Sequence, residues 1–276
     1  DPIDDPPLST TTHSGRTETT TVDGFTDHYL YDADEYLKIG VREEWGGSII
    51  FFGLADGSPG MNATNTIDAN DTGREIQVAI YDPDRQMQGC AHDASCRTGG
   101  SSCGDSITYL GWNPVQGGNR CNNGSGIESI DTAGDSLTIT TQPLQWNPNW
   151  DDASCSSDGC SDPALAYRRA DVLLTQSIRF VDDHVVELTY QVDNLTDTEH
   201  AAQDQELPTL YTANGAGGPD LWRLFRSDET QVLIDTPAGG DGWFYEDFTS
   251  PEPWVAFQND TSDYGVGLLQ ENGINA

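Results

Sequence analysis

Lysine and long apolar runs are scarce in this sequence, and each shortage excludes a class of protein. Lys38 is the only lysine beside eleven arginines, and 46 acidic against 12 basic side chains give a formal net charge of −34 over 276 residues. A field this negative repels phosphate groups, so we expect no nucleic-acid partner. The longest strongly apolar run, residues 48–55, is far shorter than the roughly 20 residues that span a bilayer, so we expect no membrane insertion.

Several motifs that mark cofactor and metal proteins are also missing. The sequence contains no phosphate-binding P-loop, no H-E-x-x-H metal motif and no dinucleotide fingerprint. The segment from Asp68 begins like a calcium loop, but its twelfth position is Ala79, where a bidentate glutamate is needed. We therefore expect no cofactor and assign no metal ligand. The acid-rich loops at 32–35, 82–84 and 158–162 leave a structural Ca²⁺ open.

Aromatic side chains are plentiful and show that the chain folds. The sequence holds 7 Trp, 10 Tyr and 8 Phe, too many for a disordered chain. Its acidic, lysine-poor composition suits a protein that works in salt, since the screening length falls to about 4 Å at about 0.5 M ionic strength. An ordinary acidic secreted protein is the alternative.

Cysteine use favours disulfides over a metal site. No two cysteines have C-x-x-C spacing, and an even number among loop residues is typical of an oxidising compartment. The sequence does not choose among the pairings, although the short loop from Cys155 to Cys160 offers a local one. The six candidates are Cys90, Cys96, Cys103, Cys121, Cys155 and Cys160.

Glycosylation sequons agree with export of the protein. The five N-x-S/T sequons begin at Asn62, Asn70, Asn123, Asn194 and Asn259. Together with the cysteines, they predict an extracellular location, either secreted or at the cell surface.

The chain divides into an N-terminal tail and one β domain. Residues 1–24 are rich in Ser and Thr, and the composition predicts a glycosylated tail or linker. Residues 25–276 form the predicted domain, with a mostly irregular, disulfide-stapled insertion at about 89–163 that one strand interrupts. Many strands, 29 glycines and long polar loops predict an all-β fold, a large antiparallel β-sandwich.

Apolar alternation places the strands. The clearest unit is a hairpin in which residues 172–181 and 184–193 each turn alternate apolar side chains to one face. The other predicted strands are Tyr36–Val41, Ser48–Leu54, Glu75–Tyr81, Ser136–Thr141, Gln231–Ile234, Trp254–Gln258 and Gly265–Gln270.

Three polar segments, at residues 65–81, 110–118 and 200–211, combine amides or carboxylates with aromatic rings. Sugar sites need this mixture, because amides and acids bind hydroxyl groups while an aromatic face stacks on the ring. The predicted partner is therefore a polysaccharide or oligosaccharide. The candidate substrate-binding residues are Arg74, Gln77, Tyr81, Trp112, Asn113, Gln116, His200, Gln205 and Tyr211.

The order of short motifs resembles that of a known group of proteins. The motifs occupy residues 38–41, 45–50, 65–77, 112–118, 205–211, 254–257 and 265–267. In this order they resemble secreted carbohydrate-active proteins with the galactose-mutarotase-like β-supersandwich. The resemblance implies a supersandwich fold over residues 28–276 and activity on sugars; it assigns no catalytic residue.

Hydrolysis of a neutral glycan is the leading prediction for the activity. A glycosidase needs two carboxyl groups that flank the bond, about 5–5.5 Å apart for retention or 6.5–9.5 Å for inversion. The candidates are Glu206 and Glu75, with Asp204 in reserve.

Two other functions stay open. A non-enzymatic glycan-binding or structural glycoprotein, such as an adhesin or filament subunit, fits the tail, the sequons and the stapled loops, and leaves self-association open. A polysaccharide lyase is the lesser alternative, because the net charge opposes an anionic substrate.

Overall fold

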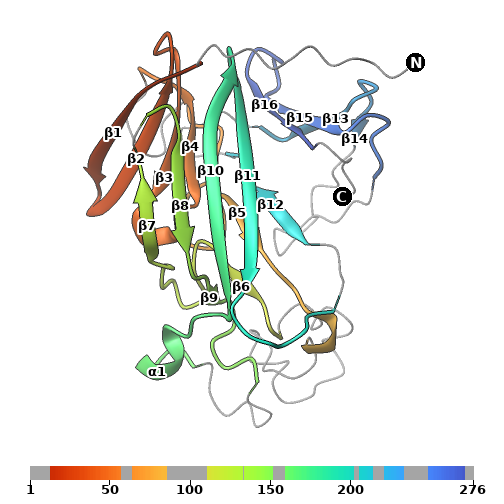
Figure 1. Cartoon of the computed structure of the whole chain (residues 1–276). Helices are drawn as coiled ribbons and strands as arrows, with labels where there is room; N and C mark the ends of the chain where they lie inside the picture. The colour runs from red at the N-terminus through yellow and green to blue at the C-terminus, as the bar shows by residue number, and fades with distance from the viewer. Residues whose placement is uncertain are drawn as a thin grey trace.

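The computed structural model describes residues 13–56, 64–85, 111–132, 134–151, 159–201, 205–213, 221–232 and 248–270. The fold is nearly all β, and every strand pair is antiparallel (Figure 1). This confirms the predicted fold class. The helical segments in the described ranges are α1, Pro163–Ala166, and two 3-10 helices, Glu43–Trp45 and Pro83–Arg85. None of them has the length and apolar character needed to cross a membrane.

The first sheet has eight strands, in the order β1-β2-β3-β4-β5-β6-β9 with β12 also paired to β5. Its strands are β1, Ser14–Val22; β2, Phe25–Asp32; β3, Leu37–Arg42; β4, Ile49–Leu54; β5, Ile76–Ala79; β6, Pro114–Val115; β9, Leu144–Gln145; and β12, Glu206–Leu210.

The second sheet has four strands in the order β11-β10-β8-β7. They are β7, Ile127–Asp131; β8, Leu137–Thr141; β10, Val172–Asp182; and β11, Val185–Asn194. The predicted hairpin is confirmed as β10 and β11, and alternate residues of β10 from Val172 to Phe180 are buried. Strand β11 lies at the edge and is mostly exposed or half-buried.

These two sheets share one hydrophobic core, so they pack as two layers. The first sheet and its flanking segment at Ile67 contribute Leu30, Ile39, Val41, Ile49, Ile67 and Ile76 to the core, and the second contributes Leu137, Ile139, Ile178 and Phe180. The supersandwich type stays a prediction.

A third sheet of four strands lies beside the other two, at the upper right of Figure 1. Its strands are β13, Arg223–Arg226; β14, Gln231–Val232; β15, Trp254–Gln258; and β16, Gly265–Leu269. It has a separate small cluster of buried side chains around Leu224, Val232 and Val255. The third sheet therefore adds to the simple sandwich that the sequence predicts.

The prediction of an N-terminal tail is wrong for residues 14–22. They form β1, which pairs with β2 from Thr17 opposite Leu30 to Val22 opposite Phe25. The turn between them is Asp23–Gly24, and both residues have positive φ, as a two-residue hairpin turn requires. Threonine is β-branched and favours strands, so the composition that suggested a glycosylated stalk builds an edge strand instead.

The predicted insertion is also more regular than expected. Strands β6 and β9 join the first sheet, whereas β7 and β8 join the second. Strand β8 confirms the strand predicted at Ser136–Thr141, whereas β6 and β9 have two residues each, too few to show apolar alternation in the sequence. The segment from 114 to 145 is therefore part of both layers.

One disulfide joins Cys121 to Cys160, with their Cα atoms 5.4 Å apart. This confirms stapling of the region but shows that pairing Cys155 with Cys160 is wrong, because Cys160 is already bonded. The bridge ties the segment after β6 to the approach of α1. Cys90, Cys96, Cys103 and Cys155 lie outside the described residues.

Candidate functional site

Strand β5 ends at Ala79. Predicted site residues from three parts of the chain lie close together just beyond this end of the strand. In the ladder between β5 and β12, Glu206 lies opposite Ala79. Tyr81 and Asp82 follow the strand and face partners more than one hundred residues away in sequence. We call Tyr81, Asp82, His200, Gln205 and Glu206 together the β5 exit site.

Tyr81 forms the first half of this site. Its hydroxyl group donates a hydrogen bond to Glu206 Oε1 at 2.7 Å. Its backbone is held by the Gln205 amide, which accepts from Tyr81 N at 2.6 Å and donates to Tyr81 O at 3.0 Å. Gln205 is exposed, and Tyr81 and Glu206 are half-buried, so a ring, an amide and a carboxyl group meet at the surface.

Asp82 and His200 form the second half. His200 Nδ1 lies 2.9 Å from Asp82 Oδ2, and His200 Nε2 lies 4.0 Å from Asp171 Oδ2. The imidazole ring stacks on the Trp112 indole at a centroid distance of 4.2 Å. The indole in turn donates from Nε1 to Asp171 Oδ1 at 2.8 Å. The histidine is therefore held between two carboxylates and an aromatic face.

Arg85 neutralises part of this negative charge. Its guanidinium lies 3.5 Å from Asp82 Oδ2 and 3.6 Å from Asp171 Oδ2. Asp82 is only 1% exposed, and Asp84 N donates to its other oxygen at 2.9 Å. His200 Nε2 is buried and has no hydrogen-bond partner in the described part of the protein. A histidine in this setting can accept or donate a proton.

The remaining predicted site residues on this strand lie at the opposite end of β5. Tyr211 N donates to Glu75 O, and Asp68 N donates to Tyr211 O, so these three residues lie side by side on adjacent segments. Arg74 forms ion pairs with Asp68 and Asp71. Tyr81 is six positions along the chain from Glu75, or about 20 Å along a strand. Tyr211 links this second group to the β5 exit site, because burial and then the Glu206 carboxylate raise the pKa of its hydroxyl group.

Burial raises the pKa values of acidic side chains in this second group. Glu75 is 0% exposed, and burial raises the pKa of its carboxyl group well above the usual range, helped by the Asp71 carboxylate. Neither of its oxygens has a hydrogen-bond partner among the described residues. Burial also raises the pKa of Asp68, and it raises the pKa of Tyr211 to about 12.

The predicted catalytic pair is not brought together. Glu206 lies opposite Ala79, which is four residues along β5 from Glu75. Four residues correspond to about 13 Å between backbone positions along a strand. Glu75 is also fully buried. Asp204, the reserve candidate, lies outside the described residues.

Three of the predicted amide side chains, those of Gln77, Asn113 and Gln116, lie inside the protein rather than at its surface. Gln77 Oε1 accepts from Gly117 N at 2.8 Å, and Asn113 Nδ2 donates to Ile80 O at 3.0 Å. Gln116 bonds to Val78 N through its oxygen. All three side chains are buried, so they hold loops and strands together, as does the indole of Trp112.

Sequence reasoning missed Asp171 and Arg85, and it treated Asp82 only as part of an acidic loop. Asp171 precedes β10, and Arg85 ends a 3-10 helix. Nothing in their spacing marks them as neighbours of His200, because the contacts join segments 82–85, 112, 171 and 200 only in the folded chain.

Two of the acidic loops considered for a structural Ca²⁺ contain carboxylates that accept hydrogen bonds from the backbone. Asp32 Oδ1 accepts from Tyr36 N at 2.7 Å, and Asp162 caps α1 by accepting from Ala164 N at 2.9 Å. Each of these carboxylates therefore has a local role, and neither loop is assigned a Ca²⁺ ion.

Four of the five sequons fall on described residues. Asn70 and Asn194 are exposed, whereas Asn123 and Asn259 are half-buried, with amide groups that donate to Ala166 O and Asp263 Oδ1. Asn62 lies outside the described residues. The two exposed asparagines are the more accessible to a glycosylating enzyme.

Comparison of the chain with protein-family models, with curated proteins and with solved structures finds no match. The resemblance to proteins with a galactose-mutarotase-like fold therefore stays a prediction.

Proposed function

We propose that this protein is an extracellular glycan-binding protein and that the β5 exit site holds the sugar. The observation that carries this proposal is the surface cluster of Tyr81, Gln205 and Glu206, which β5 and β12 bring together from segments more than 120 residues apart. Each of these side chains offers a group that sugar hydroxyls or a sugar ring can contact.

The proposed location rests on covalent structure. A disulfide between Cys121 and Cys160 is stable in an oxidising compartment and rare in the cytosol. The exposed sequons at Asn70 and Asn194 agree with the same compartment. The negative net charge of −34 favours neutral glycans over uronic-acid polymers.

Binding is preferred to hydrolysis because Glu75 is fully buried and does not reach a glycan at the surface. Hydrolysis is kept as a second candidate on one observation, the position of His200 between Asp82 and Asp171. These groups supply proton donors and acceptors at the same end of β5. Glu206 would then act with a carboxylate of this site rather than with Glu75.

Replacing Tyr81 by phenylalanine or Glu206 by glutamine should weaken glycan binding about five- to tenfold, because one hydrogen bond contributes about 1 kcal/mol. Affinity would be measured by isothermal titration against neutral oligosaccharides that the unmodified protein retains on a glycan panel. Tyr167→Phe and Glu229→Gln, on exposed residues away from the site, serve as matched controls. Equal affinity of all four variants would contradict the proposed site.

The same samples distinguish binding from cleavage. New reducing ends that disappear in Glu206→Gln would establish hydrolysis at this site, whereas unsaturated uronate products would indicate a lyase. Retention of a glycan without either product would leave binding as the function. If the unmodified protein retains no glycan and releases no product, the proposal is wrong.

A further inference from the structure

Three segments of the chain meet at the end of the molecule where β10 turns into β11. They are His13, just before β1; the turn after β2, at residues 32–36; and the turn between the hairpin strands, at residues 182–184. The β5 exit site contacts Asp171, at the other end of β10. The eleven residues of β10 span about 36 Å, so the two places are independent.

Backbone hydrogen bonds hold these segments in place. Ala33 N donates to His13 O at 2.8 Å, which ties His13 to the turn after β2. Phe180 N donates to Ser14 Oγ at 2.9 Å, which ties the start of β1 to the end of β10. The ladder between β10 and β11 shifts register between Phe180 and Asp182, a bulge of the kind that redirects a side chain.

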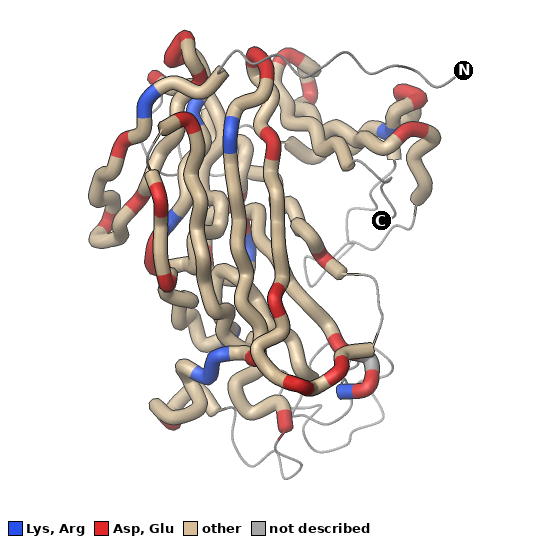
Figure 2. The backbone as a smooth tube through the Cα atoms, in the orientation of Figure 1, with Lys and Arg blue, Asp and Glu red and all other residues tan. Residues whose placement is uncertain are grey.

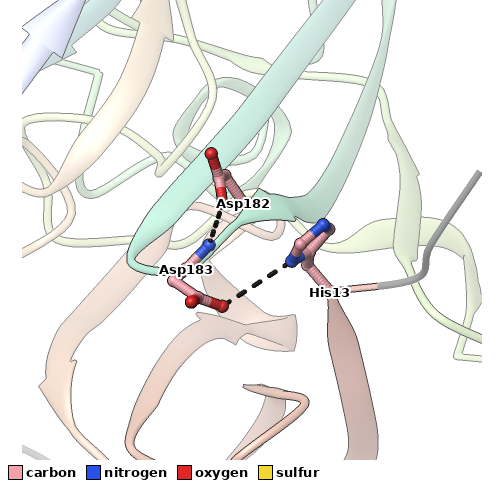
Figure 3. A group of neighbouring side chains, drawn as sticks. All are labelled: His13, Asp182 and Asp183. Atoms are coloured by element: carbon pink, nitrogen blue, oxygen red, sulfur yellow. Dashed lines mark hydrogen bonds and ion pairs between the residues drawn. The ribbon is translucent and has the colours of Figure 1, made fainter. Parts of the chain in front are cut away.

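His13, Asp182 and Asp183 converge at this point (Figure 3). Each offers one ligand atom, and these atoms all lie within 4.8 Å of one another. His13 Nδ1 is 3.7 Å from Asp183 Oδ1. Asp182 uses Oδ1 to accept from Asp183 N at 2.8 Å, and its other oxygen is not needed for that bond.

The charge of this cluster is not balanced by arginine or lysine. Among the described residues, the only ion pair of either carboxylate is the one between Asp183 and His13. Next to the cluster is an open hollow of about 400 Å³ lined by Asp32, Asp34, Tyr36, Asp183 and His184. Figure 2 shows acidic segments at several strand ends. The cluster at the β10–β11 turn also has the imidazole groups of His13 and His184 beside its carboxylates.

We propose that His13, Asp182 and Asp183 bind a divalent transition-metal ion of the Zn²⁺ type. Imidazole nitrogen and carboxylate oxygen bind Zn²⁺ at about 2.0–2.2 Å, so three ligand atoms must lie roughly 3.3–3.6 Å apart. The distance of 3.7 Å between His13 Nδ1 and Asp183 Oδ1 is already close to that spacing. The hollow leaves room for water in the remaining coordination positions.

The imidazole ligand of His13 favours a transition metal over Ca²⁺ or Mg²⁺. Ca²⁺ and Mg²⁺ take oxygen ligands, whereas imidazole suits zinc and its neighbours in the first transition row. The ion would join the start of β1 to the β10–β11 turn, and hence the first sheet to the second. This site goes beyond glycan binding and does not depend on it.

The test is isothermal titration of the full, EDTA-treated protein with ZnCl₂ in about 1 M NaCl, where a screening length of about 3 Å suppresses diffuse binding to acidic surface. One equivalent of Zn²⁺ should bind, and His13→Gln and Asp183→Asn should each weaken binding at least tenfold. Asp193→Asn, at the far end of β11, is the matched control and should bind like the unmodified protein.

Competition and spectroscopy separate this site from general attraction of cations. Excess CaCl₂ should not displace Zn²⁺, and Co²⁺ used in its place should give a visible absorption spectrum that changes in His13→Gln. Circular dichroism would verify that each variant is folded. Absence of saturable Zn²⁺ binding, or equal binding by His13→Gln and the unmodified protein, would overturn the proposal.

Discussion

Replacing Glu75 by glutamine is expected to raise the free energy of unfolding at pH 7. Burial raises the pKa of the Glu75 carboxyl group well above its usual range, so at pH 7 the folded protein holds either a buried charge or a proton that the unfolded chain has released. The carboxyl group is fully buried and without a hydrogen-bond partner among the described residues. Arg42, the cation with the largest influence on the Glu75 carboxyl group, already donates hydrogen bonds from two of its nitrogens to Asp27. Glutamine has almost the same shape and needs no proton to be neutral.

The dependence on pH has a definite sign. Burial raises the folded-state pKa of Glu75, so the folded protein keeps this proton after the unfolded chain, with a glutamate pKa of about 4.3, has released it. The stabilisation is complete below the unfolded pKa and is lost as the pH rises towards the folded pKa, by about 1.4 kcal/mol per pH unit. The Glu75→Gln variant has no proton to release at this position, so its free energy of unfolding does not fall with pH for this reason.

Urea unfolding at fixed NaCl between pH 4 and pH 8 would measure the difference. The two proteins should have similar free energies of unfolding near pH 4. As the pH rises, the free energy of unfolding of the variant should increase relative to that of the unmodified protein. Glu229→Gln, on an exposed glutamate, is the control and should show no such divergence. A variant that is less stable at every pH would show that the carboxylate is bound and charged in the folded state.

The sequence predicts strands whose apolar residues alternate and misses strands that lack this pattern, whatever their length. It misses β1 and β2, of nine and eight residues, and it predicts β15 and β16, of five residues each. Strand β10 alternates buried and half-buried residues over its length, so its period is visible in the sequence. Strand β6 has two residues, and its buried neighbours Asn113 and Gln116 are polar, so no apolar pattern marks it. The prediction of a tail at residues 14–22 is wrong because a Ser- and Thr-rich composition is common to linkers and edge strands. The Asp23–Gly24 pair, which favours a hairpin turn, distinguishes the two.

The site was predicted by residue type, and the folded chain sorts those residues into different roles. Tyr81 and Glu206 were expected to face a ligand, and the structure places them together at a surface. Glu75 and Gln77 belong to the same polar segment but lie in the interior. Alternation along a strand tells which residues share a face, but it does not tell whether another layer covers that face.

A buried amide network between the two main sheets leads to the largest expected loss of stability. Gln116 is 0% exposed. Its oxygen accepts from Val78 N at 3.1 Å, and its nitrogen donates to Gly46 O at 3.1 Å and to Gln176 Oε1 at 2.7 Å. Gln176 stands on β10 and donates to Gly47 O at 3.2 Å. The two amides therefore join β5 and the turn after β3 to the opposite sheet.

Gln116→Leu should lower the free energy of unfolding by about 3–5 kcal/mol, because leucine fills the space but leaves a buried N–H, a carbonyl and an amide oxygen without partners, at about 1–3 kcal/mol each. Urea unfolding at fixed pH and salt would measure the loss. Gln142→Leu, on a half-buried amide at the protein surface, is the control and should lose less.

The double variant Gln116→Leu with Gln176→Leu tests whether the two amides act as a unit. Leucine at both positions removes the unmatched amide of Gln176 and lets two apolar side chains meet between the sheets. The double variant should therefore lose less stability than the sum of the two single losses, by about 1–2 kcal/mol, as expected for residues in one hydrogen-bonded network. Strict additivity would mean that each amide stabilises only its own backbone partners, and that the bond between the sheets contributes nothing.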